Sequence, residues 1–98
     1  MSHDAVSVAP EIYKVLLEND RVRVLGVVGM PESRSPMHGH PDSVMHAVSD
    51  GTIRITSEHG ESETVDITAG ATFWTPSTIH SVENVGTTAV RLIRIELK

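Results

Sequence analysis

The sequence predicts an all-β domain built as a sandwich or a barrel. β-Branched residues are abundant, and Gly or Pro interrupts almost every stretch before an amphipathic helix completes three turns. Short extended segments recur instead, separated at regular intervals by turn-forming residues. A chain of 98 residues has room for a single domain with one modest core.

The expected strands are runs of apolar and β-branched residues that lie between turn signals. In chain order they cover residues 12–17, 21–28, 44–48, 52–57, 63–67, 71–75, 79–85 and 89–97, with a polar loop over residues 29–36. The pair Asp50-Gly51 stands between two of these runs and predicts a β-hairpin. His59-Gly60 predicts the next tight turn, which makes His59 a turn residue rather than a ligand.

Residues 1–10 show little periodicity. They are expected to form a flexible arm, or a strand lent to a neighbouring subunit, because terminal segments are ordered only when something ties them down. The barrel domain itself is then expected to cover residues 11–98.

Composition excludes several classes of function. Cysteine is absent, so a metal site has only nitrogen and oxygen ligands available, and we expect a cytoplasmic protein. The formal charge is −5, with scattered arginines and three aromatic residues, which argues against a nucleic-acid partner. Residues 1–5 lack the pattern of a signal peptide and no apolar run is long enough to span a bilayer, so no membrane association is expected.

Two histidines stand out in the segment Pro36-Met37-His38-Gly39-His40. In an extended chain they point to the same side and offer two imidazoles to one metal ion. Short histidine pairs also occur by chance in exposed loops, so the pair needs further support. That support is His80, which follows a strand-like segment from Gly70 to Pro76 and precedes Asn84 by four residues.

These two segments together resemble the two motifs of the cupin superfamily, and the chain is similar to small single-domain bacterial cupins. His38, His40 and Gly51 match the first motif, in which a leading Gly is replaced here by Glu32. Gly70, Pro76, His80 and Asn84 match the second motif, with one residue missing before the histidine and Thr78 in a loop that usually carries Gly.

The resemblance implies a double-stranded β-helix, the jelly-roll barrel of cupins, which holds a divalent iron, manganese, nickel, zinc or copper ion on three His and one Glu. The Glu is missing here. Its place, separated from His40 by three or four residues, is taken by Val44 or Met45.

Three readings of the site remain open. A three-histidine centre of His38, His40 and His80 resembles the thiol-dioxygenase branch of cupins and leaves the metal its full charge for a small anionic ligand. Alternatively His46 completes the site, because it shares a strand face with Val44. In the third reading the histidines only form hydrogen bonds within a polar pocket.

Two functions fit these readings. One is a metal-dependent enzyme of the oxygenase or isomerase and lyase type, acting on a small polar or carboxylate molecule. The other is a non-enzymatic cupin that binds a metal and a small ligand, as a sensor does. A homodimer is expected in both cases, because small barrels expose apolar sheet faces. Arg23 and Arg94 could line a pocket for a carboxylate substrate, but arginines on strands usually lie on the solvent face, so both are left out of the expected site.

Overall fold

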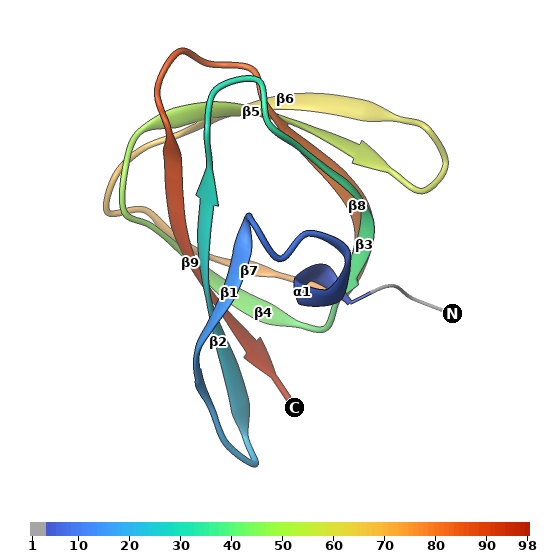
Figure 1. Cartoon of the computed structure of the whole chain (residues 1–98), viewed down its shortest axis with the longest axis vertical. Coiled ribbons are helices and arrows are strands. Elements are labelled where there is room, and N and C mark those ends of the chain that lie inside the picture. Colours follow the sequence, from blue (N-terminus) through green and yellow to red (C-terminus); the bar gives the residue numbers. More distant parts are fainter. Residues whose placement is uncertain (1–3) are drawn as a thin grey trace.

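The computed structural model describes residues 4–98 and consists, over that range, of nine strands and one short helix (Figure 1). Their bounds are α1 Ala5–Val8, β1 Tyr13–Glu18, β2 Val22–Gly29, β3 Arg34–His40, β4 Ser43–Ala47, β5 Gly51–Ser57, β6 Ser62–Ile67, β7 Thr72–Thr75, β8 Thr78–Asn84 and β9 Val90–Leu97. The all-β prediction is confirmed.

The strands form two antiparallel sheets. A five-stranded sheet has the order β1-β2-β9-β4-β7, and a four-stranded sheet has the order β3-β8-β5-β6. Most neighbours are therefore distant in sequence, as in β9, which lies between β2 and β4. The two sheets curve around a common interior, called the lumen below (Figure 1).

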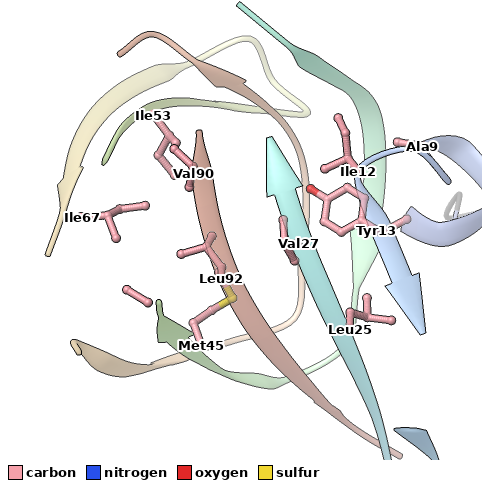
Figure 2. Packing of buried hydrophobic residues seen from close by; sticks show 12 residues of the cluster. Ala9, Ile12, Tyr13, Leu25, Val27, Met45, Ile53, Ile67, Val90 and Leu92 are labelled. Atoms are coloured by element: carbon pink, nitrogen blue, oxygen red, sulfur yellow. The ribbon is translucent and has the colours of Figure 1, made fainter. Parts of the chain in front are cut away.

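Alternation along β9 divides lumenal from outer side chains. Val90, Leu92, Arg94 and Glu96 are all buried, whereas Arg91 is exposed. Figure 2 shows Leu92 facing Met45 of β4 within the apolar cluster. The apolar end of this row supplies the core, and its charged end lies equally deep.

The Asp50-Gly51 hairpin is wrong, because β4 and β5 belong to different sheets and do not pair. The connection instead crosses from one sheet to the other, and a carboxylate oxygen of Asp50 accepts a hydrogen bond of 2.8 Å from the amide of Ala69. Gly51 is needed for close packing, since a Cβ there would lie 2.6 Å from Cγ2 of Val90. The turn at His59-Gly60 is confirmed, and it joins the paired strands β5 and β6.

The described part of the N-terminal segment, for which a flexible arm or a lent strand is expected, lies against the barrel of its own chain. Within residues 4–9, Asp4 caps α1 and bridges to Gly39, and Ala5 and Ala9 are fully buried against the barrel. Small side chains make that close contact possible. Residues 1–3 lie outside the described range, and the domain boundary at residue 11 stays a prediction. No helix within residues 4–98 combines the length and apolar character needed to cross a membrane.

Candidate metal centre

Three histidines from the four-stranded sheet converge in the lumen. His38 of β3 is the direct cross-strand partner of His80 in β8, and their ring centroids are 4.8 Å apart. His40 lies two residues along β3 on the same face, 4.8 Å from the His38 ring and 5.4 Å from the His80 ring. All three are buried, and one nitrogen from each lies within 4.8 Å of the others. The grouping predicted from spacing is therefore present.

Hydrogen bonds fix the orientation of two of the rings. Nδ1 of His38 lies 2.7 Å from the carbonyl oxygen of Pro36, and Nδ1 of His40 lies 2.7 Å from Oε2 of Glu96. Both acceptors require a protonated Nδ1, so each neutral ring carries its lone pair on Nε2. Nε2 of His40 and Nε2 of His80 are buried without a hydrogen-bond partner among the described residues.

The electrostatic setting keeps the three imidazoles neutral. Burial lowers the pKa of His38 to about 4 and that of His80 to about 3. Burial also lowers the pKa of His40, and it outweighs the opposing hydrogen bond to Glu96. Neutral imidazoles are the form that binds a transition metal, and Nε2 of His40 and of His80 has no other partner among the described residues, so the residues present fit such an ion.

A series of charged side chains is connected to the Nδ1 side of the His40 ring. Oε1 of Glu96 accepts a hydrogen bond of 2.8 Å from Nε of Arg23, and Arg23 also forms an ion pair with Asp4 at the start of α1. Burial alone would raise the pKa of Glu96, but the hydrogen bonds from His40 and Arg23 outweigh it, and the pKa is lowered. Glu96 therefore stays ionised and fixes the His40 ring, as carboxylates behind metal-binding histidines do.

Tyr13 closes the group from the opposite sheet. Its hydroxyl lies 3.1 Å from Nε2 of His38, and its ring centroid is 5.0 Å from that of His38. Burial raises the pKa of the phenol, so the hydroxyl stays protonated and donates to the imidazole lone pair. A metal bound at this nitrogen has to displace that hydrogen bond.

A cavity of about 350 Å³ opens beside the histidines. Its wall is mostly apolar, and the polar residues that line it include His80, Tyr13 and Arg94 together with several Ser, Thr and Asn residues. Arg94 is only 5% exposed, and its Nη1 donates a hydrogen bond of 3.1 Å to Oγ1 of Thr75. The size and composition are those of a small-molecule site.

The sequence model of the family described as "Cupin domain" matches residues 27–96. The chain belongs to this family. Solved structures agree: a cupin domain from Bordetella pertussis Tohama I superposes with a TM-score of 0.82 at 28% identity, covering 89% of this chain and 92% of that one. The double-stranded β-helix fold predicted from the motifs is confirmed.

Two more distant structures share the fold. A protein from Klebsiella pneumoniae with a double-stranded β-helix domain has a TM-score of 0.71 at 20% identity, over 88% of this chain and 75% of its own. The polyketide cyclase RemF from Streptomyces resistomycificus has a TM-score of 0.64 at 16% identity, over 87% and 63%. Comparison with curated proteins finds no match.

In this cupin the lumenal position that corresponds to the missing glutamate is that of Met45 and not that of Val44. Met45 is buried and faces the cavity, whereas Val44 and His46 lie on the opposite face of β4. His46 instead forms a 2.7 Å hydrogen bond with Oγ1 of Thr72 outside the lumen. The structure therefore does not bring His46 to the other three histidines.

The turn between β3 and β4 explains this reversal. Simple alternation from His38 and His40 would turn residues 44 and 46 inward, but Pro41 and Asp42 leave the extended conformation between the strands. Alternation resumes one residue out of phase, so Ser43, Met45 and Ala47 are the buried side chains.

Sequence reasoning missed the arginines of this cupin site. Arg23 and Arg94 were expected at the surface, yet Arg23 contacts Glu96 and Arg94 lies in the cavity wall. The available signal was strand phase, since Arg94 shares its parity in β9 with the apolar Val90 and Leu92. Asn84 has a structural role: its side chain bonds to the backbone of Gly29, Gly86 and Thr88.

Proposed function

We propose that this cupin binds one divalent transition metal through Nε2 of His38, His40 and His80, and acts on a small molecule held in the adjoining cavity. The observation that carries the proposal is the pair of buried Nε2 atoms, on His40 and His80, that lack any partner in the described residues. Buried polar atoms without partners are costly, and a shared ion satisfies both of them.

Three imidazole donors favour iron, nickel, copper or zinc over magnesium or calcium, and manganese remains within the set that the family implies. Such an ion supplies Lewis acidity, or activates dioxygen, at positions that the protein leaves open. The protein's own contribution is orientation and exclusion of water. Glu96 holds the His40 ring, and the mostly apolar wall limits solvent. The Tyr13 hydroxyl, which bonds to Nε2 of His38 in the metal-free protein, would be displaced by the metal and become available as a hydrogen-bond donor.

Metal analysis of protein purified without an affinity tag tests the site. We expect about one metal ion per chain in the parent protein and at least a tenfold loss in His38→Ala, His40→Ala and His80→Ala, with circular dichroism confirming the fold. His46→Ala and His59→Ala are matched controls, because both side chains lie outside the cluster, and they should retain the metal. Full metal content in all three cluster variants would refute the proposal.

A second candidate is binding without catalysis. The cavity wall contains no Asp or Glu among the described residues, and Glu96 is already engaged by Arg23 and His40. An acid–base carboxylate is therefore lacking. One experiment distinguishes an enzyme from a binding protein. The metal-loaded protein is incubated under air with a panel of small acids, and oxygen uptake and product mass are recorded. Turnover lost in His80→Ala indicates an enzyme, whereas saturable binding without product indicates a binding protein.

We also propose a homodimer formed through β1. This edge strand exposes Val15, Leu16 and Leu17, and the β1–β2 hairpin projects from the barrel body (Figure 1). Light scattering should give twice the chain mass, and Leu16→Glu should reduce it. A parent protein that is monomeric at high concentration would contradict this. The cytoplasmic location stays a prediction, which cell fractionation tests.

A further inference from the structure

The guanidinium of Arg94 lies deep in the lumen with an incomplete set of partners. Its neighbours across the sheet are Leu25 of β2 and Met45 of β4, both apolar. Nη1 donates to Oγ1 of Thr75, but Nε is buried and has no partner among the described residues. Arg94 therefore forms part of the cavity wall and carries a donor that no described residue uses.

Arg94 also lacks a counter-ion. Within residues 4–98 no ion pair joins it to a carboxylate. Glu96 lies on the same face of β9, but its two oxygens are taken by Arg23 and His40. An arginine remains charged when buried, and an unpaired buried charge is strongly unfavourable. An anion bound beside Arg94 would balance its charge and would also accept a hydrogen bond from the guanidinium.

We infer that Arg94 is the anion-binding residue of the cavity and that the ligand is a small carboxylic acid with an apolar body. The planar guanidinium offers parallel N–H donors that match the two oxygens of a carboxylate. Most of the rest of the wall is apolar and consists of aliphatic and aromatic side chains, among them Ile12, Val27, Ile53, Leu92 and Trp74, with a few Ser, Thr and Asn side chains between them. A compact hydrophilic anion would leave these surfaces without contacts, so an apolar body is required.

This inference rests on the proposed function, because it assigns the ligand class of the same cavity. His80 and Arg94 both belong to the cavity wall, and the positive charge of Arg94 helps to lower the pKa of all three histidines. The carboxylate is therefore held close to the candidate metal ligands. Arg94 acts here as a specificity residue, and it is not needed to hold the metal.

The test compares a carboxylate probe with its neutral isostere in metal-free protein. Titration calorimetry with 3-phenylpropionate and 3-phenylpropanamide should show at least about tenfold tighter binding of the acid. Arg94→Gln and Arg94→Met should lose that preference and bind both probes alike. Arg91→Gln is the matched control, because Arg91 is an exposed arginine on the same strand, and it should behave as the parent protein does.

Two further measurements distinguish failure of the anion site from failure of the metal site. Metal content of Arg94→Gln should equal that of the parent, so loss of the metal site and loss of the anion site are distinguishable. Arg94→Met should raise the melting temperature of the ligand-free protein, because it removes an unpaired buried charge. Equal affinity of the parent for the two probes, binding of neither at millimolar concentration, or an unchanged preference in Arg94→Gln would overturn the inference.

Discussion

Oε2 of Glu96 lies 2.7 Å from Nδ1 of His40, and this contact joins the two sheets of the barrel at the candidate metal centre. His40 belongs to β3 of the four-stranded sheet, whereas Glu96 belongs to β9 of the five-stranded sheet. The carboxylate therefore decides which nitrogen of the imidazole carries the proton, and it does so from a strand that contributes no histidine.

Replacing Glu96 with Gln should weaken metal binding by about 10- to 100-fold. The amide keeps the shape of the carboxylate but removes its negative charge. In the parent protein that charge holds the Nδ1 proton of His40 and makes Nε2 more basic, so the variant loses both effects. Competition with a chelating dye measures the affinity. Glu83→Gln is the control, because Glu83 is a half-buried carboxylate paired with Arg54 away from the three histidines, and an unaltered affinity is expected there. Equal affinities in the two variants would mean that Glu96 does not orient the ligand.

Tyr13→Phe should tighten metal binding by about three- to tenfold. In the metal-free protein the Tyr13 hydroxyl donates to Nε2 of His38, and a metal ion must displace this hydrogen bond, which is worth about 1 kcal/mol. Phenylalanine retains the packing against the His38 ring. The same dye competition provides the measurement. Weaker binding in this variant would show instead that the hydroxyl supports the metal-bound state.

Metal-free protein should lose stability as the pH falls from 6.5 toward 4. The pKa of His38 is lowered to about 4 and that of His80 to about 3, so the unfolded chain takes up protons in this range before the native state does. Each of these histidines then lowers the free energy of unfolding by up to about 1 kcal/mol per pH unit, and full stability is present above pH 6.5.

Urea unfolding at half-unit pH steps checks the slope. His80→Asn should flatten it, whereas His59→Asn, which changes an exposed side chain, should not. Below about pH 4.5 the unfolded chain also takes up a proton at Glu96, whose pKa is lowered in the native state, and this adds a further loss of stability, so the slope is read above that value. A flat profile between pH 4.5 and 6.5 would show that the histidines titrate normally in the native state.

Asp4→Ala should lower the free energy of unfolding by about 1 kcal/mol. The substitution removes both the side chain that caps α1 and one of the two carboxylate partners of Arg23. Asp20→Ala, in the exposed turn before β2, is the control and should leave stability unaltered. Thermal and urea unfolding followed by circular dichroism give the difference, and equal midpoints would mean that the helix contributes little.

The three candidate ligand histidines were accessible to sequence reasoning because their spacing is local. His38 and His40 lie on one strand face by simple alternation, and His80 follows the Gly70 to Pro76 pattern that accompanies it. The groups that support them come from distant strands. Tyr13, Arg23 and Glu96 meet the histidines only through sheet pairing and the closure of the barrel.

The second difficulty for prediction was to decide which side chains of a strand face the lumen. Arg94 was expected at the surface because arginine is a surface residue on most strands, although its parity with Leu92 pointed inward. His46 was considered inward because the effect of a two-residue turn on the following strand is not visible in the sequence. Asp50-Gly51 similarly has the composition of a hairpin turn but lies at a crossing between sheets.

The turn at Pro41 and Asp42 has a consequence for how metal centres diverge among such barrels. Removing one residue from this turn would shift the alternation of β4 by one residue. The side chain of Met45 would then face outward, and that of His46 would face the lumen that holds the three candidate ligands, without any substitution among them. Loop length, inherited through single-codon deletions, can thus alter coordination number as effectively as mutation of the ligands themselves.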